Sequence, residues 1–229
     1  MNSHKVLVFT GAGVSAESGI STFRDSGGLW DNYPVELVAS PSGWRNNPKL
    51  VLEFYNRRRA NAAQAQPNPA HIAIAELEKK FDVTVVTQNV DDLHERAGSS
   101  RVLHLHGELS KARSCLDENL TYSIGNKPIQ LGDKCELDSQ LRPHIVWFGE
   151  IPFFLDEAKN AFKDAAYVLV VGTSLQVEPA ASLVNSAPFK AKKIMVTLEI
   201  EHSPKGFELQ RGKAGQLVPL ICRQWLTRA

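Results

Sequence analysis

The chain has 229 residues, of which 43% are hydrophobic and 22% are charged. These values are ordinary for a globular protein with a sizeable core, and the length favours one large domain with a modest inserted lobe over two full domains. The formal net charge of +1 excludes a global field that would gather nucleic acid or hold the chain against a membrane.

The cysteines and the apolar segments indicate the compartment. Three cysteines are an odd number in a long chain and argue against a disulfide framework. The first residues carry a short apolar run rather than a secretion signal, and no segment approaches the roughly 20 apolar residues of a membrane span. We therefore expect a cytoplasmic protein with no nucleic-acid or membrane partner.

Short apolar runs rich in Val and Ile alternate with helix-like stretches. In chain order the expected elements are a strand at Lys5–Thr10, helices at Asn47–Ala65 and Pro69–Lys80, a strand at Val83–Thr87, a helix at Leu155–Ala165, a strand at Tyr167–Val171, a helix at Pro179–Ser186, a strand at Lys193–Leu198 and a helix at Gln216–Leu226. The strands lack strict alternation, which is typical of strands buried on both faces. The pattern predicts an α/β fold with a Rossmann-like parallel sheet.

Two stretches interrupt this pattern. Residues 21–65 hold a long loop with several Gly and Pro residues and then three consecutive arginines, and residues 107–142 are polar and hold two of the cysteines. We expect these stretches to pack together as a smaller inserted lobe. Residues 1–20, 66–106 and 143–229 then form the Rossmann-like part of a single domain that spans residues 1–229.

Small, hydrogen-bonding residues follow three of the predicted strands, and Thr-Leu-Glu ends the fourth. They are Gly11-Ala12-Gly13, Gln88-Asn89-Val90-Asp91, Gly172-Thr173-Ser174 and Thr197-Leu198-Glu199. Ligands of parallel α/β sheets bind at the carboxyl ends of the strands, so these residues predict a nucleotide site. The first glycines also fit a bare tight turn, because the next glycine, Gly19, is not at the usual dinucleotide-binding spacing.

Five blocks of sequence carry a family resemblance. Residues Gly11–Asp25 resemble the GAG-x-S-x-x-SGI-x-x-FRD signature of the sirtuin family, and further matches follow in the family's order at Thr87–His94, Leu105–Glu108, Phe148–Glu150 and Gly172–Ser174. The resemblance implies an NAD-dependent protein deacylase. It also implies an NAD-binding Rossmann-like part with a small lobe over the cleft, in agreement with the pattern of elements.

The resemblance implies particular site residues. It makes His106 the general base that deprotonates a ribose hydroxyl, and it assigns Asn89 and Asp91 to the nicotinamide end and the ribose. Taken alone, Asn89 or Asp91 also fits a helix cap. His104 and His106 face one side of a strand-like segment and also fit a metal-binding pair. His4, His71 and His202 are expected to be structural.

Further contacts are implied for the cofactor and the substrate. The implied NAD contacts are Gly11, Ala12, Gly13, Ser15, Ala16, Thr22, Phe23, Arg24, Trp30, Gln88, Asn89, Val90, Asp91, Gly172, Thr173, Ser174, Thr197, Leu198, Glu199 and Ala214. The implied substrate contacts outside the acyl group are Val146, Phe148, Gly149 and Glu150. The loop Thr22–Tyr33 is expected to act as a lid that excludes water.

Tyr55 and Arg58 predict the choice of acyl group. They lie three residues apart on a helix and therefore share a face. In the sirtuin branch that accepts acidic acyl groups, a Tyr-x-x-Arg pair binds the carboxylate, for which the planar guanidinium is well suited. The implied substrates are succinyl-, malonyl- and acetyl-lysine of proteins. The alternative is that residues 57–59 are an ordinary solvated arginine run.

The chain departs from the family at the structural zinc. The family has two Cys-x-x-Cys pairs, whereas this chain has only Cys115 and Cys135 in that segment. We expect no zinc, although two cysteines completed by carboxylates are an alternative. Cys222 is expected to be buried in the C-terminal helix. Apolar residues are expected to replace the metal by packing together: Leu116, Leu120, Tyr122, Ile124, Ile129, Leu131 and Leu137.

Two other functions compete with deacylation. An ADP-ribosyltransferase or NAD glycohydrolase would break the same bond and pass the ADP-ribosyl group to another nucleophile. An inactive NAD-binding scaffold is the third reading, and the intact His106, Asn89 and Asp91 argue against it.

Overall fold

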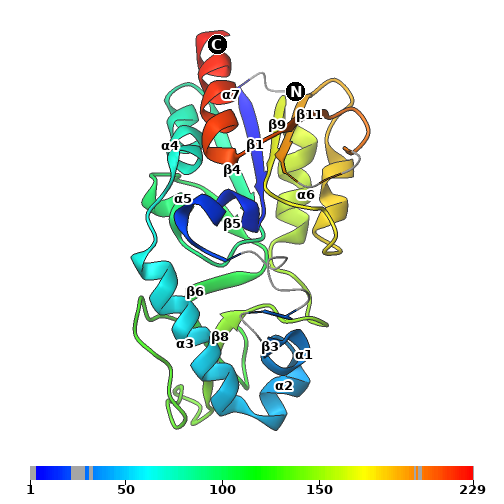
Figure 1. Ribbon diagram of the computed structural model, residues 1–229. Coiled ribbons are helices and arrows are strands. Elements are labelled where there is room, and N and C mark those ends of the chain that lie inside the picture. The colour runs from blue at the N-terminus through cyan, green and yellow to red at the C-terminus, as the bar shows by residue number, and fades with distance from the viewer. Residues whose placement is uncertain (1–3, 22–28, 31–32, 199, 201–202, 229) are drawn as a thin grey trace.

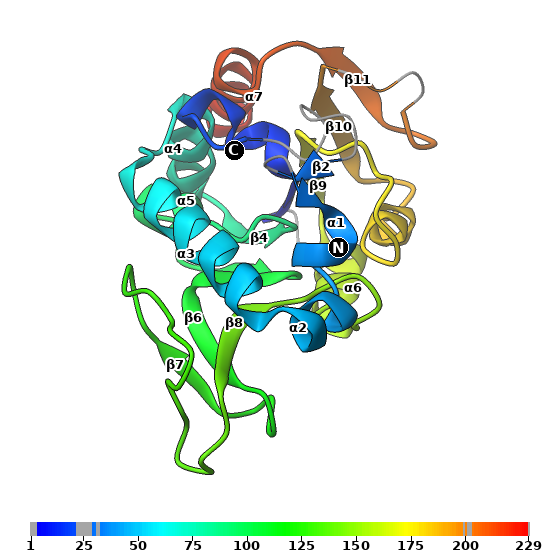
Figure 2. The ribbon, with the colours of Figure 1, turned by 60° about the horizontal axis from the view of Figure 1, so that its bottom comes forward.

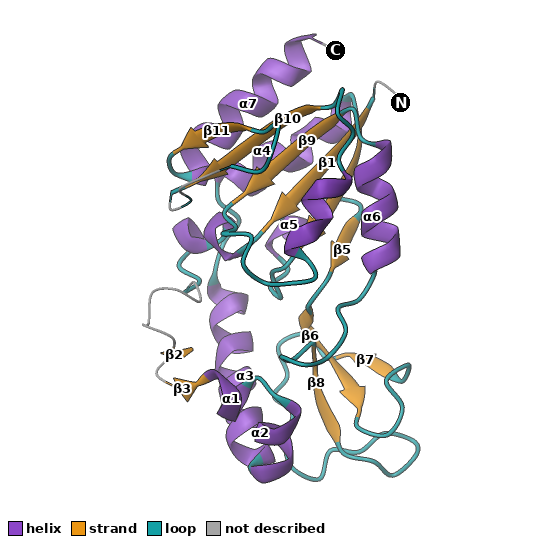
Figure 3. Ribbon diagram, turned by 90° about the vertical axis from the view of Figure 1, so that its right-hand side faces the viewer, coloured by secondary structure: helices purple, strands orange, loops and turns teal. Residues whose placement is uncertain are grey.

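The computed structural model describes residues 4–21, 29–30, 33–198, 200 and 203–228. Its main feature is a six-stranded sheet in which every neighbouring pair is parallel (Figures 1 and 3). In spatial order the strands are β11 (Glu208–Arg211), β10 (Lys192–Thr197), β9 (Tyr167–Val171), β1 (Lys5–Thr10), β4 (Asp82–Thr87) and β5 (Val102–His104). The Rossmann-like α/β architecture is therefore confirmed.

The order of the strands defines where such a sheet binds ligands. From β1 the chain builds outward through β4 and β5 on one side, and later through β9, β10 and β11 on the other. The direction reverses between β1 and β9, and crevices at such reversal points hold ligands in doubly wound sheets. The loops after these two strands are in contact, because Gly11 N donates to Val171 O (3.0 Å) and Gly13 N donates to Gly172 O (2.8 Å).

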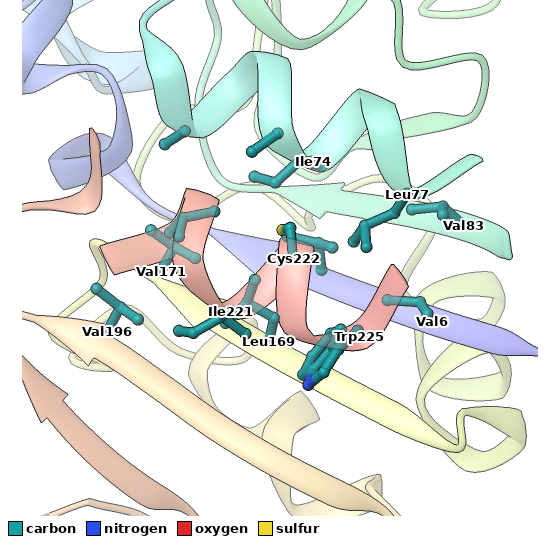
Figure 4. Close-up of a cluster of buried hydrophobic side chains, with 14 of the residues drawn as sticks. Val6, Ile74, Leu77, Val83, Leu169, Val171, Val196, Ile221, Cys222 and Trp225 are labelled. Carbon is teal, nitrogen blue, oxygen red and sulfur yellow. The ribbon is translucent and has the colours of Figure 1, made fainter. Parts of the chain in front are cut away.

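Helices cover both faces of the sheet. Helices α4 (Pro69–Glu76) and α7 (Ala214–Arg228) pack on one face, and the cluster in Figure 4 shows Ile74 of α4 and Trp225 of α7 over the strands. Helix α6 (Leu155–Asp164) and the 3₁₀ helix η4 (Ala181–Ser186) cover the other face. Because successive strand residues point to opposite faces, a strand covered on both sides is apolar throughout, as the runs of Val and Ile predicted.

The other elements form a smaller group beside the sheet. Strands β6 (Gly107–Ser114), β7 (Thr121–Ser123) and β8 (Leu141–Ile145) make an antiparallel sheet in the order β7-β6-β8. Figures 1 and 2 show this sheet beside α3 (Pro48–Gln64), with α1 (Val35–Val38) and α2 (Pro41–Asn46) close by. The remaining short elements are β2 (Leu29–Trp30), β3 (Tyr33–Pro34), α5 (Leu93–Arg96) and the 3₁₀ helices η1 (Ala12–Val14), η2 (Ala16–Ser18) and η3 (Leu77–Lys79).

The chain segment between β6 and β8, residues 115–140, does not form the apolar cluster that was expected. The exposed fractions of Leu116, Leu131 and Leu137 are 71%, 54% and 50%, and only Ile129 of the expected set is buried. Side-chain amides connect the loops instead. Gln140 Nε2 donates to Gln130 O (2.9 Å), and Asn56 of α3 exchanges two hydrogen bonds with the backbone of Ile129 (2.8 and 2.9 Å). The expected apolar cluster is therefore wrong for Leu116, Leu131 and Leu137, while Ile124 and Ile129 pack in a small cluster with Leu52 and Ala112. Hydrogen bonds hold much of the rest of this segment.

Candidate active site

The two loops at the reversal point approach each other too closely for side chains. A Cβ atom on Gly11 would lie 2.7 Å from the Thr173 Cβ, and one on Gly13 would lie 2.8 Å from the Gly172 Cα. Contacts below 3.0 Å with backbone or a short side chain force a shift of the loop. These glycines therefore let the loop after β1 pack against the loop after β9, a reason for them that the sequence pattern did not reveal.

Ser15 joins the predicted site residues into one network. Its side chain is fully buried between η1 and η2. The Asn89 Nδ2 donates to Ser15 Oγ (3.1 Å), and Ser15 Oγ donates to Asp91 Oδ2 (3.2 Å). Asn89 and Asp91 are each 6% exposed, so the structure brings all three polar groups together at the carboxyl ends of β1 and β4.

His71 fixes the direction of these hydrogen bonds. Its Nδ1 accepts from the Asn68 backbone N–H (3.3 Å) as part of a capping box at the start of α4. Burial lowers the pKa of His71 to about 4, so at neutral pH the ring is neutral and its proton is on Nε2, 3.4 Å from Ser15 Oγ. Because Ser15 Oγ accepts from His71 and Asn89, its own proton is directed to Asp91.

The Asp91 carboxylate has a second partner. Its Oδ1 accepts from the Leu93 N–H (3.2 Å) in the turn that precedes α5, a helix whose N-cap residue is Asp92 and makes no side-chain cap hydrogen bond. Burial raises the pKa of Asp91, and the hydrogen bonds from Leu93 and Ser15 oppose that shift. Asp91 thus stabilises the turn before α5 and belongs to the network with Ser15, but neither Asn89 nor Asp91 is the cap residue of this helix.

Burial favours the neutral form of the His106 imidazole, and a hydrogen bond fixes its tautomer. Its Nδ1 lies 3.1 Å from Gln88 O, and since a carbonyl only accepts, the Nδ1 carries the proton and Nε2 keeps its lone pair. Burial lowers the pKa of His106, and the bond to Gln88 O opposes this in part. The next residue, Gly107, has φ +83°, and a Cβ there would lie 2.0 Å from His144 O. Only glycine fits that position.

His104 has different partners from His106. Its Nδ1 lies 3.0 Å from Asn89 O and its Nε2 lies 2.7 Å from Glu95 Oε1. Burial opposes the charged ring, but the hydrogen bond and charge of Glu95 outweigh it, and the pKa of His104 is raised. Both ring nitrogens are occupied, so His104 does not form a metal-binding pair with His106. Within the described part of the chain, no three His, Cys, Asp or Glu side chains cluster as a metal site.

The three consecutive arginines of α3 lie in three environments. Arg57 is exposed, Arg58 is half-buried with its guanidinium 5.6 Å from the Phe54 ring, and Arg59 is 2% exposed. Arg59 donates to Leu109 O (2.5 Å) and to Asn56 Oδ1 (2.7 Å). Only Arg57 is therefore solvated as the alternative reading required. Arg59 connects α3 to β6 through its hydrogen bond to Leu109 O.

Tyr55 is fully buried in the apolar cluster that Val90 also contacts. Its phenol oxygen accepts from Trp147 Nε1 (3.1 Å). Burial raises the pKa of Tyr55, and the positive charge of Arg58 opposes the shift. Tyr55 is therefore a protonated phenol within the electrostatic reach of Arg58, as their spacing predicted.

Residues 146–150 connect the loop after α1 to His106. Val146 N donates to His106 O (2.9 Å), and Phe148 N donates to Ala39 O (3.0 Å). Phe148 is 49% exposed, and Gly149 has φ +93°. The Glu150 carboxylate accepts from Arg142 (2.8 and 3.1 Å), Arg113 (3.0 Å) and the Trp147 N–H (2.8 Å). Glu150 thus braces this segment, while its contact with substrate stays a prediction.

The remaining predicted residues lie in several parts of the structure. Gln88 Nε2 donates to Thr173 Oγ1 (3.1 Å), which links the loops after β4 and β9. Thr197 is buried at the end of β10, Leu198 is exposed, and Ala214 is buried at the start of α7. Ser174 is half-buried, Ala16 is exposed, and Trp30 lies in β2. Thr22, Phe23, Arg24, Glu199 and most of the expected lid lie outside the described residues.

Several members of the site were not expected from the sequence. Thr10 Oγ1 donates to Thr87 Oγ1 (2.8 Å) and lies 3.0 Å from His94 Nε2. The His94 and His71 rings are 4.8 Å apart, and burial holds the pKa of His94 well below its ordinary value. These residues form a neutral, buried layer behind the polar network. Their partners are far away in sequence, so no local pattern reveals them.

Comparison with known proteins agrees with this architecture. The model of the Sir2 family matches residues 11–179. An NAD-dependent protein deacylase of Helicobacter pylori is 56% identical over 182 residues, which cover 80% of this chain and 79% of that protein. A mutant Sir2 homologue in complex with ADP-ribose superposes with a TM-score of 0.88 at 39% identity, covering 98% of this chain and 92% of that one. A Sir2 homologue in complex with NAD gives a TM-score of 0.83 at 39% identity, covering 98% and 90%. The chain belongs to the Sir2 family.

Proposed function

We propose that this chain removes succinyl, malonyl and acetyl groups from protein lysines with NAD as co-substrate, giving nicotinamide, O-acyl-ADP-ribose and free lysine. The observation that carries the proposal is the His106 imidazole bonded to Gln88 O, the residue before Asn89 of the Asn89–Ser15–Asp91 network. The activity named for the Helicobacter pylori relative supports it.

The residues at this edge fit NAD. An amide, a hydroxyl and a carboxylate converge from Asn89, Ser15 and Asp91, and Thr173 lies on the other side of the reversal point. Such groups suit the carboxamide and hydroxyls of a dinucleotide, and their position at the carboxyl ends of parallel strands supports the proposal, because α/β sheets bind nucleotides there. When bound, NAD supplies a nicotinamide–ribose bond that can be broken. His106 Nε2 is the atom that would accept a proton from a ribose hydroxyl.

The imidazole of His106 is expected to titrate below its ordinary pKa of 6.5, because burial disfavours the charged ring. The base therefore stays neutral and active at neutral pH, and activity falls only as the pH drops through the lowered pKa. Proton NMR of the ring, assigned by the signal that disappears in His106→Ala, measures this directly. A midpoint above 6.5 contradicts the assignment of the tautomer and the burial.

The choice of acidic acyl groups is supported by charge around Tyr55. Arg58 lies close enough to lower the pKa of Tyr55, and burial keeps the phenol protonated. A protonated phenol and a guanidinium together form three hydrogen bonds to a carboxylate. Kinetics on one peptide with acetyl-, malonyl- or succinyl-lysine tests this. We expect kcat/KM for the acidic groups to match or exceed that for acetyl, and a preference for acetyl of more than about 10-fold contradicts it.

We also propose that the protein needs no structural zinc. The thiols of Cys115 and Cys135 are free, and among the residues that the structure describes no third ligand joins them as a metal cluster. A closed structural zinc site needs four such ligands. Purified protein is expected to carry well below one equivalent of zinc and to keep its melting temperature and activity after chelation. Stoichiometric zinc whose removal unfolds the small lobe contradicts this.

The proposed partners are acylated lysines of proteins in the cytoplasm. Three free thiols are typical of a reducing compartment. Among the described residues, no helix combines the length and apolar character needed to cross a membrane.

A further inference from the structure

A buried contact connects Tyr55 to Trp147, which lies within residues 146–150, the stretch predicted to bind substrate. Trp147, 2% exposed, donates its indole N–H to the Tyr55 oxygen, with 3.1 Å between Nε1 and Oη. The two rings lie 6.5 Å apart, tilted by 37°. The residues are 92 positions apart, so the contact joins helix α3 to the segment that follows β8. The surroundings of the Tyr55 hydroxyl are therefore set in part by residues outside its own helix.

Charged groups hold the Trp147 indole in place. The Arg142 guanidinium lies 3.3 Å from the centre of the Trp147 ring, within the range of a cation–π contact. Arg142 donates twice to Glu150 (2.8 and 3.1 Å), and Glu150 also accepts from the Trp147 backbone N–H (2.8 Å). The carboxylate thus fixes both the backbone of Trp147 and the cation that covers its ring. A rotation of the indole would break this arrangement.

The direction of the Trp147 bond limits what Tyr55 can do. An indole N–H only donates, so the phenol oxygen accepts from it. The O–H bond of a phenol lies in the ring plane and has two preferred orientations. The one that points toward the indole is blocked by the N–H. The Tyr55 hydroxyl is therefore directed away from Trp147 as a donor.

We infer that Trp147 is a positioning residue for acyl choice, because its indole N–H orients the Tyr55 hydroxyl to donate to the terminal carboxylate of a succinyl or malonyl group. This inference rests on the proposed function, since it requires Tyr55 to contact that carboxylate. Trp147 acts through Tyr55 and needs no contact with the substrate. Its effect is then specific for acidic acyl groups.

The test is the variant Trp147→Phe, which keeps an aromatic ring and removes the N–H. We expect the ratio of KM for succinyl-lysine to KM for acetyl-lysine peptide to rise roughly 3- to 10-fold, the scale of one hydrogen bond. Trp225→Phe is a matched control. That indole is also buried, in the cluster under α7, and its N–H has no hydrogen-bond partner among the described residues. Its KM ratio is expected to stay at the parent value.

A double-mutant cycle separates positioning from general packing. In a Tyr55→Phe background, Trp147→Phe is expected to cause no further rise in the KM ratio, because the group that it orients is gone. The inference is overturned if Trp147→Phe raises the KM ratio equally in both backgrounds. It is also overturned if the variant raises KM equally for both peptides. If Tyr55→Phe itself leaves the ratio unchanged, the proposed acyl choice fails and the inference fails with it.

A second substitution covers the case in which Trp147→Phe does not fold. Incorporation of β-(3-benzothienyl)alanine at position 147 replaces the indole N–H by sulfur at nearly the same shape. The same 3- to 10-fold rise in the KM ratio is expected, again on the scale of one hydrogen bond. A parent-like ratio in this folded protein overturns the inference.

Discussion

His106→Ala is expected to lower kcat/KM for deacylation by roughly 10²-fold or more, because a general base contributes on that scale. The parent ring donates from Nδ1 to Gln88 O and keeps a lone pair on Nε2. Alanine removes this lone pair and with it the predicted proton acceptor. The network of Asn89, Ser15 and Asp91 does not include His106, so NAD is expected to bind with nearly the parent affinity.

Steady-state kinetics and calorimetric titration with NAD check both parts of this prediction. The melting temperature of the variant serves as the control for folding. A variant with activity within a few-fold of the parent removes His106 from the role of base. Loss of NAD binding together with activity shows that the residue supports the site rather than the proton transfer.

Arg58→Met is expected to raise KM for a succinyl-lysine peptide about 10- to 100-fold, since the loss of one partner of a carboxylate costs about 1.5–3 kcal/mol. Tyr55→Phe removes a neutral donor and is expected to have a smaller effect in the same direction. KM for the acetyl-lysine peptide is expected to change far less, because an acetyl group has no terminal charge. The measurement is the KM of each variant for both peptides.

Arg57→Met is the matched control for this prediction. Arg57 is the adjacent arginine on α3, carries the same charge and is exposed, with its guanidinium 5.8 Å from the Tyr33 ring. It is expected to leave the preference between the two peptides unchanged. An equal effect of Arg57→Met and Arg58→Met points to the total charge of α3 and contradicts a specific site. An equal rise of KM for both peptides in Arg58→Met points to a role of Arg58 in folding.

The parts of the fold that follow from local pattern were predictable. All four predicted strands lie within one residue of β1, β4, β9 and β10, and three predicted helices match α3, α6 and α7 within two residues at each end. The predicted helix at Pro69–Lys80 is α4 followed by the 3₁₀ helix η3. The predicted helix at Pro179–Ser186 is the 3₁₀ helix η4. Runs of Val and Ile mark strands that are covered on both faces, because every position along them is buried. Cys222 is buried in α7, as expected.

Other parts depend on contacts between distant residues. The edge strands β5 and β11 are short, and β6 to β8 are rich in polar residues, so neither group shows a distinctive apolar run. The bond between His71 and Ser15 joins residues 56 positions apart, and the bond between Trp147 and Tyr55 joins residues 92 positions apart. No local periodicity contains that information.

One missed residue did have a local signal. Arg59 lies four residues after Tyr55 and three before Ala62, on the face of α3 that carries its buried side chains. Helical phase alone therefore separates Arg59 from its exposed neighbour Arg57. The alternative interpretation of residues 57–59 as one solvated run does not fit this period.

The most direct test of the central proposal is the stoichiometry of products from an acylated peptide and NAD. Mass spectrometry of a reaction with acetyl- or succinyl-lysine peptide is expected to show free lysine peptide, nicotinamide and O-acyl-ADP-ribose in equimolar amounts. Free ADP-ribose with the peptide still acylated, or ADP-ribose attached to protein, would contradict deacylation and show that the same bond of NAD is broken for a different acceptor.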